Sequence, residues 1–333
     1  MKFSVRFNND MPAERFVHMA ALAEEVGFDQ IWVSNDLFWH SAPVLVAAAA
    51  RVTSRIALGV GVFNPVSMHP AEIAMVASSL HEVSGGRFCL GLGAGADEFL
   101  NWAGLAAGAP VSRTERAIKE LQALFAGEAP EGWRPEGRLR TGPVPMPIYI
   151  GAMGPLMLRL AGRRADGALP LLLPPDRYLY AAARINEGAR ESGRDPSSID
   201  LAACIWCSLD DNKARAKRAL ASKIAYYGAS FSPDLLAGIS LTVHDFRAIQ
   251  QAMSNGLTER ATDLVTPAML SLGVAGGVDE IVEASARLVA AGARHISFGP
   301  PLGPNPAQAV AALGKRVLPA LNERRSTRSS SDS

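Results

Sequence analysis

The sequence has little of several features that would assign it to a specialised class of protein. Three cysteines among 333 residues exclude a disulfide framework. Lys and Arg number 33 and Asp and Glu 32, so a net charge of +1 leaves no basic surface for nucleic acid. The longest apolar run, Ala42–Ala50, is far shorter than the roughly 18 residues of a membrane span. The first ten residues carry charges in place of the apolar core of a signal peptide. We therefore expect a soluble, cytoplasmic protein that binds neither nucleic acid nor membrane.

A large apolar fraction is present instead. Hydrophobic residues make up 48% of the chain and charged residues 20%, which provides for an extensive core and excludes wholesale disorder. The 30 glycines and 22 prolines are scattered without a period, which indicates many turns. From Glu323 onward the chain is rich in Ser and Arg, and we expect residues 323–333 to form a disordered tail.

Short apolar runs alternate with amphipathic helical patterns along most of the chain. The runs are almost continuously apolar, as is typical of parallel strands that are covered on both faces. Between them, apolar residues recur at helical spacing, as from Phe16 to Val26 and from Ile73 to Val83. Eight such units favour an α/β fold of the (β/α)8 TIM-barrel type, in one domain over residues 1–322. The predicted strands are Phe3–Phe7, Gln30–Ser34, Ile56–Val62, Phe88–Gly93, Pro147–Ile150, Asp166–Leu169, Ile199–Cys207 and His295–Phe298.

Two segments interrupt this alternation, one after the fourth strand and one after the seventh. Residues 94–146 contain one predicted helix, Arg113–Ala126, followed by a stretch rich in Gly, Pro and Arg. Residues 208–294 contain several helical patterns, namely Asp211–Tyr227, Val243–Ser254 and Val278–Ala291. Both insertions follow strands, and barrels build their active sites on that face.

The segment GLGAGA (residues 91–96) matches a dinucleotide-binding fingerprint. A Rossmann fold would place this motif on its first βα turn, with a helix opening at once. Here the motif ends the fourth predicted strand, and no clear long helix follows. We favour a barrel strand whose glycines let a flat ligand approach the backbone, with tight packing at a crowded turn as the alternative.

Cysteine spacing also imitates a functional site. Cys204 and Cys207 form a CxxC motif inside a predicted strand, where a spacing of three residues places the two side chains on opposite faces. We interpret them as core thiols, and Cys89 has no evident partner. No His/Glu pair has helical metal-ligand spacing, so we expect no metal.

Polar groups gather at the ends of two predicted strands. The segment SNDLFWH (residues 34–40) ends the second strand, where a barrel would carry its site, although Ser41 also fits an N-cap of the following helix. The segment IGAMGP (residues 150–155) places proline at the start of an apolar helix. Such a helix end presents free N–H groups to an anion, and a plain βα turn is the alternative.

These residues resemble the bacterial luciferase-like superfamily and, within it, the methylenetetrahydromethanopterin reductases, which use the deazaflavin coenzyme F420. The resemblance covers residues 1–321. The turn SGGR with the glycine strand is typical of the superfamily, and the segments GAMGP and PLGP point to the reductase branch. The matching segments are residues 22–33 (LAEEVGFDQIWV), 58–65 (LGVGVFNP), 80–88 (LHEVSGGRF), 91–95, 147–155 (PIYIGAMGP), 165–168 (ADGA) and 299–304 (GPPLGP).

The resemblance implies an oxidoreductase that transfers a hydride between F420 and a small organic substrate, with a methylene-tetrahydropterin-like one-carbon carrier as a candidate. An FMN-dependent luciferase-like monooxygenase or reductase is the alternative, and we expect a homo-oligomer, either a dimer or a tetramer. The family also implies a non-prolyl cis peptide bond at Gly61–Val62. The cofactor-binding residues implied are Ser34, Asn35, Gly61, Val62, Asn64 and Gly93 around the ring, and Gly151, Ala152, Met153 and Gly154 at the phosphate.

Departures from the reductase pattern concern the acid–base groups. The branch carries a glutamate near the end of strand one, where this chain has Arg6, and an arginine cannot usefully donate a proton. The remaining candidates for proton transfer are Asp36 and Asp97, with His40 or His69 behind them. Arg6 would hold a phosphate or a carboxylate, or stabilise an anionic ring, and Asp36, Asp97 or a ligand anion would be its partner. A non-catalytic barrel that binds a deazaflavin is the alternative from another functional class.

Overall fold

The computed structural model describes residues 1–95, 97–106, 108–171, 175–228, 231 and 233–329. Its parallel strands close into a ring in the order β6-β5-β4-β3-β2-β1-β9-β7, and β7 pairs back to β6. This closure confirms the predicted TIM barrel, and the Rossmann alternative is wrong because an open sheet would leave two unpaired edges. The strands of the ring are β1 (Lys2–Phe7), β2 (Gln30–Val33), β3 (Ala57–Phe63), β4 (Phe88–Leu92), β5 (Ile148–Ile150), β6 (Gly167–Ala168), β7 (Asp200–Leu209) and β9 (His295–Leu302).

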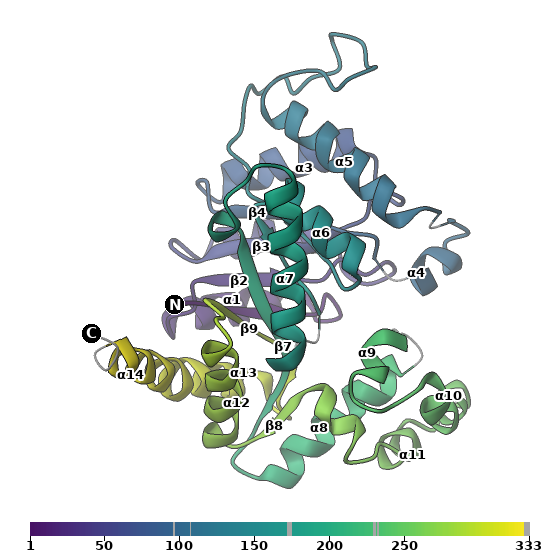
Figure 1. Ribbon diagram of the computed structural model, residues 1–333, viewed down its shortest axis with the longest axis vertical. Coiled ribbons are helices and arrows are strands. Elements are labelled where there is room, and N and C mark those ends of the chain that lie inside the picture. Colours follow the sequence, from purple (N-terminus) through teal and green to yellow (C-terminus); the bar gives the residue numbers. More distant parts are fainter. Residues whose placement is uncertain (96, 107, 172–174, 229–230, 232, 330–333) are drawn as a thin grey trace.

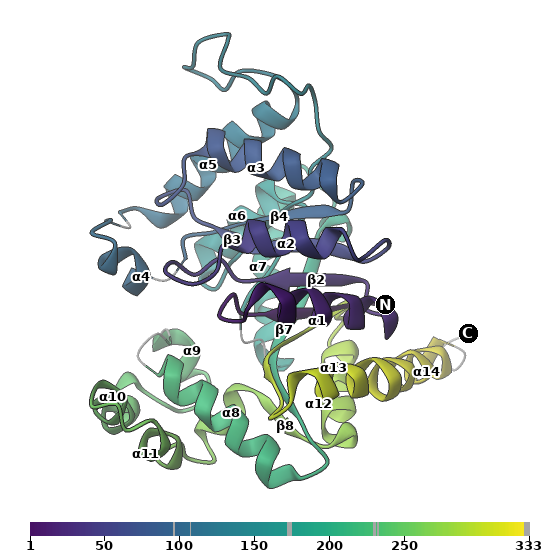
Figure 2. The ribbon, with the colours of Figure 1, turned by 180° about the vertical axis from the view of Figure 1, so that it is seen from behind.

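Helices surround the ring, and the amino terminus lies on the same side of the molecule as α14 in the two opposite views (Figures 1 and 2). Apolar faces predicted from the sequence point inward, as in α1, where Phe16, Met19 and Ala23 are buried. Apart from those of the two insertions, the helices between the strands of the ring are α1 (Ala13–Glu25), α2 (Ala42–Ala50), α3 (Pro70–Val83), α6 (Pro155–Arg164) and α7 (Pro175–Glu191). Two further helices, α13 (Pro306–Ala312) and α14 (Leu318–Ser329), follow β9. Within the described residues, no helix combines the length and the apolar character that a membrane crossing requires.

The two insertions lie after β4 and β7, as predicted. The first contains α4 (Asp97–Trp102) and α5 (Pro110–Phe125); α5 begins three residues earlier than predicted, because proline is well suited to the first turn of a helix. The second contains α8 (Lys213–Tyr227), α9 (Pro233–Ala237), α10 (Arg247–Ser254), α11 (Thr258–Asp263) and α12 (Val278–Ala290). The predicted helix Val243–Ser254 is divided into a 3₁₀ turn, Val243–Phe246, and α10.

A short strand within the second insertion was not predicted from the sequence. β8 (Val274–Gly276) pairs in parallel with the end of β7. The insertion has an apolar core of its own around Trp206, Leu220, Phe231 and Phe246. Since Trp206 belongs to β7, this core is fixed directly to the barrel, beside the carboxyl ends of its strands.

Other sequence predictions concern the cysteines and the tail. Cys204 and Cys207 are free and buried, which confirms them as core thiols, and Cys89 is also a buried free thiol. Helix α14 continues through Ser329, so it extends into the segment for which we expected disorder. Residues 330–333 lie outside the described residues, as does Ala96 of the glycine motif.

The arginine of the SGGR turn, Arg87, directly precedes β4 and has a structural role at the amino-terminal end of the barrel strands. Arg87 donates hydrogen bonds to the carbonyl oxygens of Ile56 (2.8 Å), Thr53 (3.0 Å) and Ala50 (3.2 Å). Three backbone carbonyls that helix α2 and strand β3 leave unpaired are thereby satisfied. This arginine joins two units of the barrel and lies away from the carboxyl ends of the strands.

Candidate functional site

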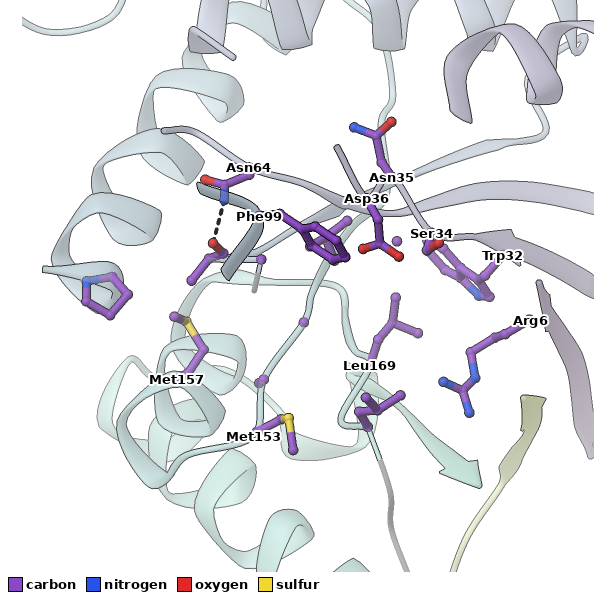
Figure 3. A pocket seen from close by; sticks show the side chains of 18 of the residues that line it. Arg6, Trp32, Ser34, Asn35, Asp36, Asn64, Phe99, Met153, Met157 and Leu169 are labelled. Atoms are coloured by element: carbon purple, nitrogen blue, oxygen red, sulfur yellow. Dashed lines mark hydrogen bonds between the residues drawn. The ribbon is translucent and has the colours of Figure 1, made fainter. Parts of the chain in front are cut away.

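A pocket of about 660 Å³ opens at the carboxyl ends of the strands (Figure 3). Its volume is within the range of small-molecule and cofactor sites, roughly 300–1,000 Å³. The ends of β1, β2 and β3, the start of α6 and the insertion after β7 all contribute to its wall. Most of the residues predicted for the site line this pocket, namely Arg6, Ser34, Asn35, Asp36, Gly61, Val62, Asn64, Gly151, Ala152, Met153 and Gly154.

One wall of the pocket is built on the bulge in β3. The Gly61–Val62 peptide bond is cis, as the family resemblance implied, and both residues line the pocket. Gly93 does not line it, but an ideal Cβ at Gly93 would lie 3.0 Å from Cγ2 of Val62. An ideal Cβ at Gly151 would lie 2.9 Å from Cγ1 of the same side chain. The two glycines therefore leave room for Val62, and Gly93 shapes the pocket from behind.

The start of α6 is where the sequence analysis expected a phosphate. The N–H of Gly151 donates to the carbonyl oxygen of Leu92 over 2.9 Å, so this predicted phosphate donor is already used. In the described part of the chain, no hydrogen bond is recorded for the N–H groups of Ala152, Met153 and Gly154, and all three residues line the pocket. They directly precede the first turn of α6, where the helix dipole favours negative charge. This end of the pocket fits a phosphate.

The polar loop after β2 is held by a residue that the sequence analysis missed. Asn9 is only 1% exposed, and its Nδ2 donates to the carbonyl oxygens of Asp36 (2.9 Å) and His40 (2.7 Å). The Ser34 hydroxyl donates to Oδ1 of Asn9 over 2.9 Å. Ser34 therefore positions the loop through Asn9. The signal in the sequence that could have identified Asn9 is the pair of asparagines, Asn8 and Asn9, directly after the first strand.

Asp36 is the carboxyl group of the pocket wall. Burial raises the pKa of Asp36 above its usual value, while the Ser34 hydroxyl and the Lys223 ammonium oppose that rise. The neighbouring Asn35 accepts a hydrogen bond from the N–H of Ala42 (3.3 Å), at the start of α2. Ser41 makes no side-chain cap, so the predicted capping role belongs to Asn35.

Asp97 and the two histidines lie elsewhere. Asp97 begins α4, is exposed and does not line the pocket. His40 is exposed, and His69 caps α3 by accepting from the N–H of Ala71 over 3.2 Å. Neither histidine lines the pocket, so of the predicted proton-transfer candidates the structure brings only Asp36 to it. The amide of Asn64 bonds to the carbonyl of Ala94, which shapes the loop after β4 (Figure 3).

Basic groups at the pocket include one that the sequence analysis missed. Arg6 lines the pocket as predicted, but its partner is the carbonyl oxygen of Ile205 at 2.9 Å, in place of a carboxylate. Lys223 of α8 also lines the pocket, together with Trp206 and Tyr227. A lysine seven residues after the buried Ala216, on the apolar side of a predicted helix, was the signal for it.

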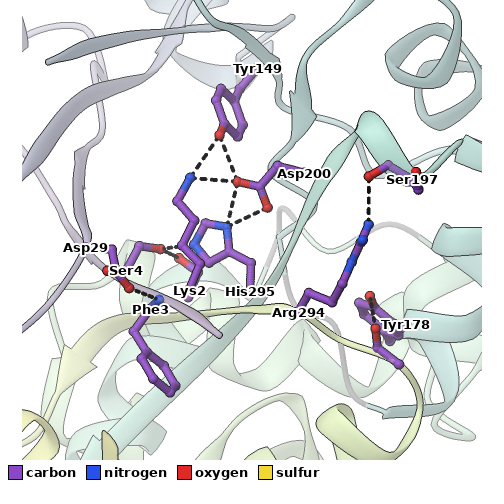
Figure 4. Close-up of polar contacts among 12 residues, drawn as sticks. Lys2, Phe3, Ser4, Asp29, Tyr149, Tyr178, Ser197, Asp200, Arg294 and His295 are labelled. Atoms are coloured by element: carbon purple, nitrogen blue, oxygen red, sulfur yellow. Dashed lines mark hydrogen bonds and ion pairs between the residues drawn. The ribbon is translucent and has the colours of Figure 1, made fainter. Parts of the chain in front are cut away.

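A second polar cluster lies around the amino-terminal ends of β1, β7 and β9 (Figure 4). His295 contacts Asp200 (Nδ1 to Oδ1, 3.0 Å) and Ser4 (Nε2 to Oγ, 2.8 Å), and Lys2 pairs with Asp200 at 2.7 Å. The arrangement of Ser4, His295 and Asp200 has the order of a catalytic triad. Ser4 and His295 are both 0% exposed, however, so a substrate has no access and the cluster stabilises the barrel.

No group of three or more His, Cys, Asp or Glu side chains among the described residues is placed to hold a metal ion. The pocket instead combines a backbone anion site, one carboxyl group and two basic side chains. A parallel barrel with such a pocket at the carboxyl ends of its strands has the architecture of an enzyme that acts on small molecules.

The chain belongs to the family described as luciferase-like monooxygenase, whose model matches residues 3–295. This membership confirms the predicted family and the prediction of an oxidoreductase of this class.

Individual relatives match over almost the whole chain. The 5,10-methylenetetrahydromethanopterin reductase of Archaeoglobus fulgidus is 30% identical over 331 residues, which cover 96% of this chain and 100% of the relative. The F420-dependent glucose-6-phosphate dehydrogenase of Microbacterium testaceum is 30% identical over 362 residues, which cover 97% of this chain and 99% of the relative. The solved structure of the coenzyme F420 dependent tetrahydromethanopterin reductase of Methanopyrus kandleri matches with a TM-score of 0.87 and 26% identity. The match covers 96% of this chain and 99% of that structure's chain.

Proposed function

We propose that this protein is an F420-dependent oxidoreductase that transfers a hydride between the deazaflavin and a small organic substrate. The observation that carries the proposal is the pocket itself: Gly61 and Val62 of β3 line it together with residues 152–154, whose N–H groups bond to no other described residue. The F420-dependent activities named for the relatives support this choice of cofactor. When bound, F420 supplies a hydride donor or acceptor at its ring.

The side chains of the pocket would manage the proton that accompanies the hydride. Reduction of a C=O or C=N bond places the hydride on carbon and a proton on oxygen or nitrogen. Asp36 lines the pocket, and because burial raises its pKa it keeps a proton to a higher pH than an exposed aspartate does. We assign the proton-transfer role to Asp36, and we leave Asp97 out of it because Asp97 does not line the pocket.

A methylene-tetrahydropterin-like one-carbon carrier is the first substrate to test, because a methylenetetrahydromethanopterin reductase is 30% identical to this chain over 96% of its length. The arginine at position 6 separates this chain from the reductase pattern, so we include glucose 6-phosphate, named for another relative, in the same panel. Turnover would be followed by the F420 absorbance. The expected homo-oligomer stays a prediction, and light scattering of the pure protein would size it.

The test of the cofactor is calorimetric titration of the pure protein with F420 and FMN in parallel. We expect F420 to bind with a dissociation constant in the micromolar range or below, and FMN to bind more weakly. Tight binding of FMN without F420 would favour the luciferase-like monooxygenase or flavin reductase alternative. Binding of NAD(P)H alone would contradict both cofactors. F420 binding without turnover of any substrate in the panel would favour the non-catalytic barrel.

A further inference from the structure

Arg6 crosses the inner wall of the barrel from β1 to β7. Its Nη2 donates to the carbonyl oxygen of Ile205 over 2.9 Å, and β9 lies between these two strands. The guanidinium passes over Gly299, where an ideal Cβ would lie 2.7 Å from Cζ of Arg6. Its Nε is buried and has no hydrogen-bond partner. A guanidinium has five N–H donors, and the structure records one hydrogen bond for this one.

Lys223 brings a second cation to the same pocket from α8. Its Nζ lies 4.3 Å from the ring centroid of Tyr227 and 5.7 Å from that of Trp206. In the described part of the chain, no hydrogen bond and no carboxylate within ion-pair distance is recorded for this ammonium. Burial lowers the pKa of Lys223 to about 8; Asp10 and Asp36 oppose that change and Arg6 adds to it. The ammonium is therefore held in the pocket by aromatic faces, with its donors unused.

The charges of the pocket wall do not balance. Among the described residues that line the pocket, Arg6 and Lys223 are cationic and Asp36 is the only carboxyl group. Cations that are removed from water need an anionic partner. With one carboxyl group for two cations, the pocket keeps a net positive charge that a bound anion would neutralise.

This cationic end is distinct from the anion site at α6. In the ring of eight strands, β1 is four strands away from β5, which precedes α6, so the two lie on opposite sides of the barrel. Figure 3 shows Arg6 on one side of the pocket and Asn64 and Met157 on the other. A phosphate that is held by residues 152–154 therefore leaves Arg6 and Lys223 available to another molecule.

We propose that Arg6 and Lys223 together bind an oxyanion, a carboxylate or a phosphate, that the substrate carries. A guanidinium suits two oxygens of one such group, and the ammonium of Lys223 adds a point charge from α8. This inference rests on the proposed function, because it takes the α6 end as the place of the cofactor. It defines the substrate class as an anionic organic molecule whose reacting carbon lies between the two ends.

The test uses the full chain, with and without saturating F420, and two probes, sodium acetate and inorganic phosphate. Affinity for each probe is measured by calorimetry at constant ionic strength, with acetamide as a neutral control. We expect millimolar-range binding of at least one anion, and no binding of acetamide. The preferred probe identifies the oxyanion as a carboxylate or a phosphate.

Three variants assign the binding to the two cations. Arg6→Met and Lys223→Met should each weaken the preferred anion about tenfold or more, whereas Lys223→Arg, which keeps the charge, should bind it within a few-fold of the wild type. Lys217→Met removes an exposed lysine of the same helix and should change nothing. Circular dichroism checks that each variant is folded. If Lys223→Met does not fold, the pH dependence of anion affinity decides the question, because Lys223→Arg should lose the decrease that the wild type shows as the pH rises through about 8.

Several results would overturn the proposal. These are the absence of anion binding, equal binding by all variants, and competition of the anion with F420, which would place it at the α6 end. Failure of F420 to bind would instead contradict the proposed function. The two failures are distinguishable, because anion affinity is also measured in the protein without F420.

Discussion

Arg6 and Gly299 are fitted to each other on neighbouring strands of the barrel. The arginine reaches the carbonyl oxygen of Ile205, 2.9 Å away, through the space that any side chain at position 299 would need. An ideal Cβ at Gly299 would also lie 3.0 Å from that carbonyl oxygen. The missing side chain on β9 is therefore the reason that a long cationic side chain of β1 extends across the pocket wall.

Gly299→Ala should consequently destabilise the protein. We expect a loss of about 1–3 kcal/mol in the free energy of unfolding, because the added methyl group overpacks the wall and displaces the guanidinium. Urea unfolding followed by circular dichroism measures it. The cost should be smaller in an Arg6→Ala background, where only the contact with Ile205 remains. Equal costs in the two backgrounds would show that Arg6 and Gly299 do not interact.

Gly154→Asp should weaken cofactor binding and leave the fold intact. A Cβ at Gly154 meets nothing within 4 Å, and its φ of −85° is accessible to any residue. The new carboxylate would repel a phosphate directly and occupy the positive end of α6, so we expect F420 affinity to fall about tenfold or more. Calorimetry measures the loss, and Gly154→Ala is the matched uncharged control. Unchanged affinity in Gly154→Asp would place the phosphate elsewhere.

Oxyanion binding should depend on pH through Lys223. Because burial lowers the pKa of Lys223 to about 8, its ammonium loses the proton as the pH rises through that value, and the affinity for acetate or phosphate should fall. Lys223→Arg should remove most of this decrease, since an arginine stays charged. The other titratable or charged groups that act on this lysine or share its helix face are Arg6, Asp10, Asp36, Tyr226 and Tyr227. An affinity that is constant from pH 7 to 9 would exclude Lys223 from the site.

The cluster around His295 should make the protein sensitive to acid. Burial lowers the pKa of His295 below its ordinary value of 6.5, although Asp200 opposes the change. The unfolded chain therefore binds a proton that the folded chain excludes, and the free energy of unfolding should fall as the pH drops below about 6.5. Protonation of Asp200 would lower it further in stronger acid, since His295 and Lys2 outweigh burial and hold the pKa of Asp200 below its usual range.

Urea unfolding at pH 7.5, 6.0 and 5.0 measures this dependence. His295→Gln should be less stable than the wild type at pH 7.5, because its contacts with Asp200 and Ser4 are lost, and its stability should change less between pH 7.5 and 5.0. His18→Gln, which replaces an exposed histidine of α1, is the matched control and should keep the wild-type profile. An identical pH dependence in all three proteins would mean that His295 is not the responsible group.

The succession of strands and helices along the chain, the two insertions and the glycine-rich strand ends were predictable because they are local properties of the chain. Apolar runs of strand length alternate with helical periodicity, and each pattern acts within about ten to fifteen neighbouring residues. Strand β8 has three residues and no apolar run of its own, and it exists only because the end of β7 offers it a partner. Such a strand has no signal in its own sequence.

In the candidate site, too, some features were predictable from the local sequence and others depend on the tertiary structure. The sequence placed Arg6 near the end of the first strand, and placed residues 152–154 before a helix by the proline that follows them. It did not show that Ile205, and not a carboxylate, accepts from Arg6, or that Lys223 lies at the same pocket. Those contacts join residues about 200 positions apart, and closure of the ring together with the packing of α8 against Trp206 decides them. Periodicity determines which face a residue takes, whereas its partner across the barrel depends on how all the strands pair at once.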